Sequence, residues 1–116
     1  MSNLARYIFL LLSVPQLLGM LLHPPLNSFL IHQMTPEDIE YVTYKQNIWP
    51  DPKMPKIARV INGTREDKDF PDGSRLTTYV YWYIEAFQTK CKSTLKYLLK
   101  KGSKLGTQRI FYECYQ

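Results

Sequence analysis

The chain is poor in the residues that most often carry enzyme chemistry. Of its 116 residues only two are cysteine and two are histidine, His23 and His32. A zinc site needs about four ligands, and both histidines lie in or beside an apolar N-terminal segment, so they cannot complete one. The motifs of a P-loop, a zinc-protease helix and a serine-hydrolase elbow are also missing. We therefore expect no catalytic residue, no metal ligand and no cofactor, and a protein that is not an enzyme.

The chain is also too short for several common architectures. A length of 116 residues leaves no room for a Rossmann domain, an α/β barrel or a repeat array. The hydrophobic fraction of 45% is too high for an intrinsically disordered tail. These two limits together indicate a single folded domain.

Acidic residues are absent from much of the C-terminal part. The whole chain carries a formal charge of +5, whereas residues 86–112 contain seven bases and no acid. Such a surface could hold an anionic partner, for example a glycosaminoglycan, a sialylated surface or a lipid headgroup. A solvated strand face that blocks edge aggregation is the commoner explanation of such a pattern. The predicted patch consists of Lys92, Lys96, Lys100, Lys101, Lys104 and Arg109.

One long uncharged run is present, and it lies at the N-terminus. Arg6 precedes sixteen residues without charge, residues 7–22, which is typical of a secretory signal peptide. The run contains Pro15 and is shorter than the ~20 residues of a membrane span. We predict a signal peptide over residues 1–22, with cleavage as late as about residue 33. An uncleaved membrane anchor through residues 7–22 and a buried N-terminal helix remain alternatives.

Two further features fit a secreted chain. Asn62-Gly63-Thr64 is an N-x-T acceptor for glycosylation, which is usable only in the secretory pathway. The cysteines, Cys91 and Cys114, are even in number, as a disulfide in an oxidising compartment requires. We therefore predict a secreted glycoprotein modified at Asn62, and we expect no nucleic-acid partner.

Both cysteines fall in a predicted C-terminal β-hairpin. Residues 92–100 alternate apolar and basic side chains, and residues 107–115 are β-branched and aromatic. Gly102-Ser103 between them is a two-residue turn signal, although a short helix over the first run is an alternative. A turn centred there places Cys91 opposite Cys114, within the reach of a disulfide; a metal site or a reactive thiol is the other use of such a pair. The same register pairs Lys92 with Glu113, Leu95 with Ile110 and Lys96 with Arg109.

The middle of the chain predicts one helix, two strands and a loop. Thr35 is an N-cap followed by Pro36, and Asp38 holds the capping-box position of a helix that ends near Asn47. A short strand is expected over residues 56–62. The run of residues 62–75 contains four acids, two glycines and a proline, and it predicts a solvated loop, with a weak resemblance to a calcium loop as the alternative.

The most regular strand is predicted over residues 75–90. Both of its faces are apolar or aromatic, so it should be a central strand with a helix on one side. Its tyrosines form a stripe, which indicates cross-strand packing or a binding platform. The fold class is therefore α+β: one N-terminal helix on an antiparallel sheet of about four strands, with a disulfide-closed C-terminal hairpin, over residues 34–116.

This order of elements, with the signal peptide and the disulfide hairpin, resembles the cystatin superfamily. Residues 35–47 match the family's single helix, residues 56–61 the strand that follows it, and residues 83–91 the next strand. The resemblance implies a secreted binding or interaction protein and raises inhibition of cysteine proteases as a function.

The chain departs from inhibitory cystatins in three respects. Residues 62–75 lack the Q-x-V-x-G motif, Gly102-Ser103 stands where a Pro-Trp pair is usual, and the cysteines are fewer. The resemblance therefore implies a divergent or non-inhibitory member. The alternative function is that of a signal-anchored accessory subunit in a membrane complex.

Overall fold

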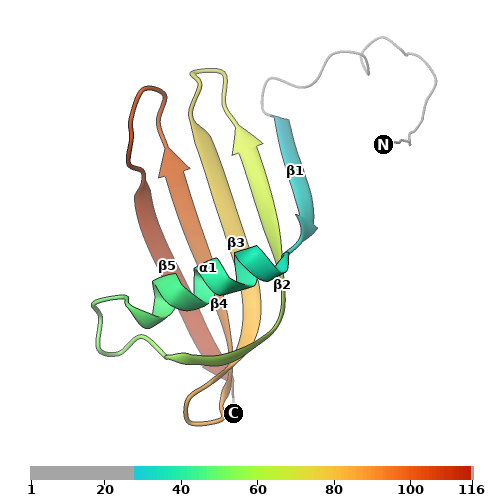
Figure 1. Ribbon diagram of the computed structural model, residues 1–116, viewed down its shortest axis with the longest axis vertical. Helices are drawn as coiled ribbons and strands as arrows, with labels where there is room; N and C mark the ends of the chain where they lie inside the picture. The colour runs from blue at the N-terminus through green and yellow to red at the C-terminus, as the bar shows by residue number, and fades with distance from the viewer. Residues whose placement is uncertain (1–27, 116) are drawn as a thin grey trace, which may run out of the picture.

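The computed structural model describes residues 28–115, which form one antiparallel sheet with a helix across it. The strands follow one another in sequence order, β1-β2-β3-β4-β5, and α1 crosses a single face of the sheet (Figure 1). The α+β class is confirmed, with five strands in place of the expected four or so. The elements are β1 Ser28–Gln33, α1 Pro36–Asn47, β2 Ile57–Asp69, β3 Arg75–Glu85, β4 Lys90–Leu99 and β5 Thr107–Tyr115.

The predictions for the N-terminal segment concern residues outside the described range. They are the signal peptide over residues 1–22 and its two alternatives, an anchor through residues 7–22 and a buried N-terminal helix. Within residues 28–115, no helix combines the length and the apolar content that crossing a membrane would require.

The strand that the sequence did not predict is β1. It pairs antiparallel with the second half of β2, from Ser28 opposite Asp69 to Gln33 opposite Thr64. β2 has backbone N–H and C=O groups along both edges, and it lies between β1 and β3, which supply the hydrogen-bond partners of these groups. The sheet therefore begins upstream of residue 34, where the domain was expected to start, and a cleavage as late as residue 33 would remove β1.

The predicted loop over residues 62–75 was wrong, because most of it is strand. Only residues 70–74 form a turn, with Gly73 in the left-handed region at φ 90°. Aspartate and glycine disfavour strands, but arginine contacts to the two aspartates, one across the strands and one within β2, offset this preference. The Arg75 Nε donates to the Asp69 carboxylate at 2.7 Å, and the Arg65 Nε donates to Asp67 at 3.2 Å. Of the three aspartates considered as calcium ligands, Asp67 and Asp69 thus contact arginines, and Asp72 accepts hydrogen bonds from Ser74.

The register of the C-terminal hairpin agrees with the prediction. Cys91 lies opposite Cys114 and the two form a disulfide, and the three other predicted pairs are also present. The predicted two-residue turn was wrong, since the strands stop at Leu99 and Thr107 and residues 100–106 form a longer loop. The register survives because this loop is centred on the same two residues.

The core lies between α1 and the sheet face that α1 covers. Tyr79, Tyr81 and Tyr83 on β3 point into it and are 6%, 0% and 0% exposed. They pack with Val42 of α1 and Leu95 of β4, which are fully buried. The tyrosine stripe is therefore part of the core, and the opposite face of β3 is the one left open.

A buried polar network joins α1 to the sheet inside this core. The Gln46 side chain accepts a hydrogen bond from the Tyr81 hydroxyl at 2.8 Å and donates to the Tyr83 hydroxyl at 2.9 Å. It also donates to the Pro55 carbonyl at 2.9 Å, and Tyr83 continues the network to Ser93 at 2.8 Å. Burial raises the pKa of both tyrosines, so their hydroxyls stay protonated as hydrogen-bond donors.

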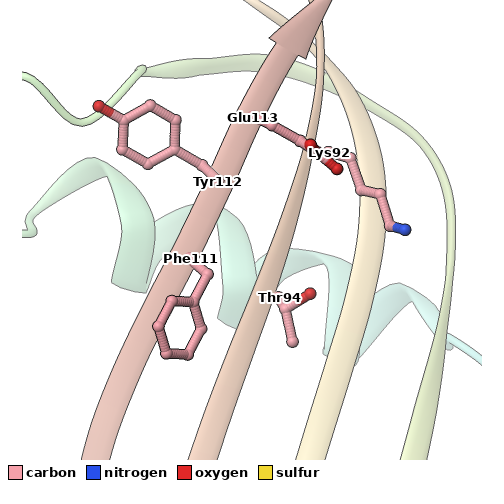
Figure 2. Close-up of a pocket in the computed structure, with 5 residues that line it drawn as sticks. All are labelled: Lys92, Thr94, Phe111, Tyr112 and Glu113. Atoms are coloured by element: carbon pink, nitrogen blue, oxygen red, sulfur yellow. The ribbon is translucent and has the colours of Figure 1, made fainter.

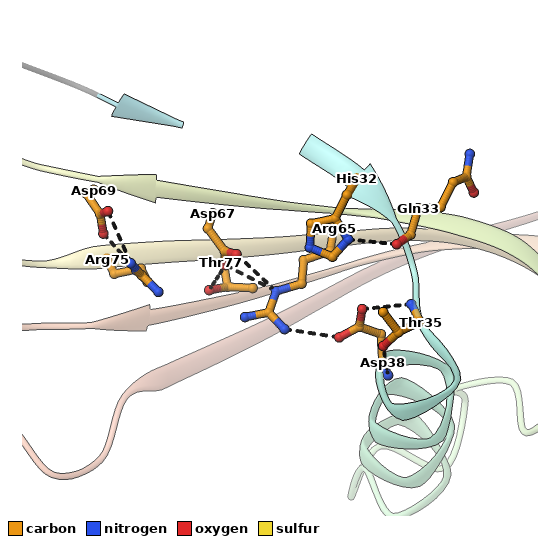
Figure 3. A network of polar contacts seen from close by, with 9 residues as sticks. All are labelled: His32, Gln33, Thr35, Asp38, Arg65, Asp67, Asp69, Arg75 and Thr77. Atoms are coloured by element: carbon orange, nitrogen blue, oxygen red, sulfur yellow. Dashed lines mark hydrogen bonds and ion pairs between the residues drawn. The ribbon is translucent and has the colours of Figure 1, made fainter. Parts of the chain in front are cut away.

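A second network fixes the start of α1 on β2 (Figure 3). Thr35 and Asp38 form the predicted capping box, with each side chain accepting the other residue's backbone N–H. The Asp38 carboxylate also accepts a hydrogen bond from Arg65 at 3.0 Å. Burial raises the pKa of Asp38, but the Thr35 N–H and Arg65 outweigh it and hold the pKa below its ordinary value. These contacts hold the start of α1 against β2. The sheet face opposite α1 is not covered by this helix (Figure 1).

Candidate binding surface on the open face of the sheet

The sheet face opposite α1, called here the open face, carries several cations beside exposed or partly exposed aromatic rings. Cross-strand pairs on an antiparallel sheet share a face, so the register defines its members. α1 is the only helix of the described chain, and it lies on the other side (Figure 1). The open face of the last three strands consists of Leu76, Thr78, Val80, Trp82 and Ile84, then Lys90, Lys92, Thr94, Lys96 and Leu98, and then Thr107, Arg109, Phe111, Glu113 and Tyr115.

Trp82 is the centre of a cation and aromatic cluster. Its ring stacks on Tyr115 with centroids 5.6 Å apart and planes inclined by 29°. The ammonium groups of Lys90 and Lys92 lie 5.2 Å and 5.4 Å from the Trp82 centroid. Contact with a ring face orients a lysine without neutralising its charge. We call Trp82, Tyr115, Lys90 and Lys92 the Trp82 cluster.

The structure separates the predicted basic patch into two groups. Lys92, Lys96 and Arg109 lie on the open face and, with Lys90, form the strand group. Lys100, Lys101 and Lys104 lie in the exposed loop over residues 100–106 and form the loop group. At ~3.3 Å per residue, Lys100 is about 33 Å along the chain from Lys90. The loop group therefore lies beyond the end of β4 nearer to Lys96 and Arg109, whereas Lys90 and Lys92 lie near the other end.

Three cations of the open face were missing from the predicted patch: Lys90, Arg59 and Lys68, which lies opposite Leu76. Lys90 lies two residues before Lys92, so the alternation of side chains along a strand was enough to predict that both are on the same face. Arg59 reaches the open face only because β2 has register irregularities, and its cross-strand partner is Ile84. The position of a bulge depends on tertiary pairing, so the sequence alone could not place Arg59 there.

A shallow hollow of about 230 Å³ lies beside the Trp82 cluster (Figure 2). It is lined by Lys92, Thr94, Phe111, Tyr112 and Glu113. Glu113 stands opposite Lys92 and raises the pKa of the neighbouring Tyr115 hydroxyl, with which it shares a hydrogen bond. The hollow thus combines an ammonium group, an apolar ring and one acid that reduces the local positive charge.

The glycosylation acceptor Asn62 lies on the same face, across β3 from Lys92. Its side chain is exposed and its cross-strand partner is Trp82. A hollow of about 270 Å³ lies next to it, lined by Gln33, Asn62, Gly63, Thr64, Val80 and Trp82. Gly63 is required by packing, because a Cβ there would be 2.6 Å from the Met34 sulfur. The acceptor triplet is therefore presented at the surface with an open space beside its asparagine.

A second surface is formed at the end of the sheet where β1 begins. The β2–β3 turn over residues 70–74 and the loop over residues 100–106 lie at this end (Figure 1). They touch, since a Cβ on Gly73 would be 2.7 Å from the Lys101 side chain. The loop also exposes Leu105, at 86%. We call these segments the loop end.

The described residues offer no cluster of three or more His, Cys, Asp or Glu side chains that could hold a metal ion. Comparison of the chain with protein-family models, with curated proteins and with solved structures finds no significant match in any of the three. Any function must therefore be argued from the surfaces described above.

Proposed function

We propose that this chain is a secreted, cystatin-like glycoprotein that acts as a binding protein and holds a sulfated polysaccharide on its open face. The Trp82 cluster carries this proposal, because Lys90 and Lys92 are held side by side on a face that no described helix covers. Because both ammonium groups lie within 5.4 Å of one ring centroid, their fields add and attract a polymer that carries repeated anionic groups. No enzymatic activity is proposed.

The balance of charge supports a polyanion over a neutral ligand. On the open face of β4 and β5, the four cations of the strand group stand against one acid, Glu113. Lys90 and Lys96 are about 20 Å apart along one strand, which suits a linear polymer better than a small ion. Each surface cation adds only about 1 kcal/mol, so affinity depends on several of them acting together.

Retention on immobilised heparin tests the proposal with three double variants of equal charge change. K92A/K96A removes half of the strand group, K101A/K104A removes most of the loop group, and K45A/K53A changes lysines away from both groups. We expect K92A/K96A to weaken binding by about tenfold or more at physiological salt, and K45A/K53A to change it little. Equal retention of all three variants would refute a role for the open face. Binding to anionic vesicles but not to heparin would favour a membrane surface as the partner.

The exposed Asn62 supports glycosylation as part of this proposal. Expression in secreting cells should give a product whose mass falls on treatment with an N-glycosidase. N62Q and T64A should lack the modification, because the acceptor requires both side chains. N-terminal sequencing of the product tests secretion: a first residue between about 20 and 28 supports it. A membrane-bound product that retains residues 7–22 supports the alternative of an anchored accessory subunit.

Cysteine-protease inhibition is a second candidate function, and it is favoured by one observation. Two turns far apart in sequence, over residues 70–74 and 100–106, are adjacent at the loop end. Neither has the motif of inhibitory cystatins, so we expect at most weak inhibition of a papain-type protease. A stoichiometric titration that shows tight inhibition would place the function at the loop end instead of the open face.

A further inference from the structure

β5 is an edge strand with unusually little protection against pairing. Within residues 28–115 it pairs with β4 alone, so one side of its backbone has no sheet partner. It has nine residues, its register with β4 is regular, and it contains no proline. Natural edge strands usually avoid pairing through bulges, prolines, short length or repeated lysines. None of these features is present in β5, so its outer edge can accept another strand.

The sequence of β5 is self-complementary when it is reversed about Phe111. Arg109 and Glu113 lie at equal distances on either side of this residue. An antiparallel pair of β5 strands centred on Phe111 would therefore place Arg109 of each copy opposite Glu113 of the other. The two Phe111 rings would meet on the axis, and Ile110 would lie opposite Tyr112 of the second copy. Opposite charges and aromatic pairs are the favourable cross-strand partners of antiparallel sheets.

This register also resolves an unfavourable contact within one copy. Arg109 lies opposite Lys96 on β4, a like-charge pair at an exposed position. On its other side, a second copy would supply the carboxylate of Glu113. The new neighbour brings a counter-charge to the place where the single chain has a surplus of positive charge.

The exposure of the apolar side chains of β5 also indicates that this strand can accept a partner. Phe111 is 55% exposed, although it lies at the middle of a strand with regular pairing. Tyr112 and Tyr115 are 40% and 42% exposed. The Tyr112 hydroxyl donates to the Lys53 carbonyl, so the loop that precedes β2 lies on the α1 side of the sheet.

We propose that two copies of this chain associate through β5, antiparallel and about a two-fold axis at Phe111. The axis is perpendicular to the sheet, because opposite residues of an antiparallel pair share a face. Both open faces then lie on the same side of one continuous sheet, and both helices lie on the other. The contact is a single strand edge, so the association is weak and reversible. It does not depend on the polyanion proposed above.

Charge reversal at two positions tests the register. R109E and E113R each place like charges opposite one another twice in the dimer, so each should weaken association by at least about tenfold. The double variant R109E/E113R restores both pairs and should dimerise as the wild type does. The decisive sample is an equimolar mixture of R109E and E113R. One chain then has two acids and the other two bases, so a heterodimer should form although neither chain dimerises alone.

Sedimentation velocity from about 10 µM to about 1 mM protein, without polyanion, measures these associations. R109E also serves as a folding control, because the introduced carboxylate faces Lys96 and should not lower the melting temperature of the monomer. Should E113R fail to fold, the neutral variants E113Q and R109Q test the same pair, and each should weaken dimerisation. A wild type that stays monomeric throughout this range overturns the proposal. The proposal is also overturned if R109E and E113R dimerise as strongly as the wild type, or if their mixture forms no heterodimer.

Discussion

The buried Gln46 network makes the most specific prediction about the stability of this fold. Replacing Gln46 by Met keeps an unbranched helix-forming side chain of similar length but removes every hydrogen bond of the amide. The Tyr81 hydroxyl then has no acceptor, and Tyr83 and the Pro55 carbonyl each lose a donor. These groups lie in a core where Gln46, Tyr81 and Tyr83 are all 0% exposed, so water cannot replace the lost partners.

The expected cost follows from the penalty of an unsatisfied buried polar group. Each orphaned donor or acceptor costs ~1–3 kcal/mol, and Tyr83 keeps its bond to Ser93, so we expect Q46M to lose about 2–4 kcal/mol. That is a large part of the ~5–15 kcal/mol that stabilises a typical domain. The melting temperature of a domain of this size should fall by roughly 10–25 °C.

A double-mutant cycle distinguishes this reasoning from general damage to the core. Y81F alone leaves the Gln46 oxygen unpaired and should cost about 1 kcal/mol or more. In the Q46M background the same change removes the orphaned hydroxyl, so it should cost less than it does alone, or stabilise. Urea unfolding followed by circular dichroism, with the disulfide intact, gives all four free energies. Additive effects of Q46M and Y81F, or a cost of Q46M below about 0.5 kcal/mol, would refute the assignment of a coupled network.

Three further predictions concern other parts of the molecule. C91A/C114A opens a loop of sequence separation 23 and should lower the free energy of unfolding by about 3 kcal/mol, measured by denaturant titration. Asp38→Asn removes the carboxylate that Arg65 contacts and should cost ~1–3 kcal/mol at pH 7. Because the pKa of Asp38 is held below 3.8 in the folded state, its contribution is present above this pH and is lost as the pH falls through the folded pKa. The difference between wild type and D38N should therefore shrink in acid, and a constant difference down to about pH 2 would contradict this. E113Q removes the one acid beside the strand group, so at a concentration where the wild type is monomeric it should increase heparin retention. An unchanged elution salt under these conditions would show that Glu113 does not face the polymer.

The sequence was sufficient to predict the structures that depend on residues close together in the chain. The capping box of Thr35 and Asp38 is an interaction over three residues, and the sequence shows it directly. The register of the C-terminal hairpin also follows from short-range pairing, since Cys91 and Cys114 lie opposite one another about a nearby turn. Neither prediction depended on knowing what the rest of the sheet does.

The predictions that were wrong concern segments whose structure depends on partners on other strands. The second half of β2 contains Asp67 and Asp69, which favour loops. It becomes a strand because β1 pairs with one edge, and Thr77 and Arg75 of β3 bond the two aspartates at the other. β1 itself has no signal of its own beyond a few apolar residues. The candidate site combines both cases. Strand parity placed Lys92 and Lys96 on one face, whereas the position of Trp82 under the lysines required the register between β3 and β4.

The glycosylation acceptor Asn62, the strand group and the proposed pairing through β5 constrain one another. Adjacent strands are ~4.8 Å apart, so Asn62 on β2 and Lys92 on β4 lie about 10 Å apart on opposite sides of Trp82. A glycan on Asn62 would cover the β2 side of the face, and a polyanion would have to approach from the side of β4 and β5. Pairing through β5 would bring two such accessible sides together, because the strand groups of both copies lie near the axis while both Asn62 residues lie farther out, on β2. The dimer would thus present its cations as one central surface bordered by glycans. A polymer long enough to contact both strand groups would bind the dimer more tightly than the monomer.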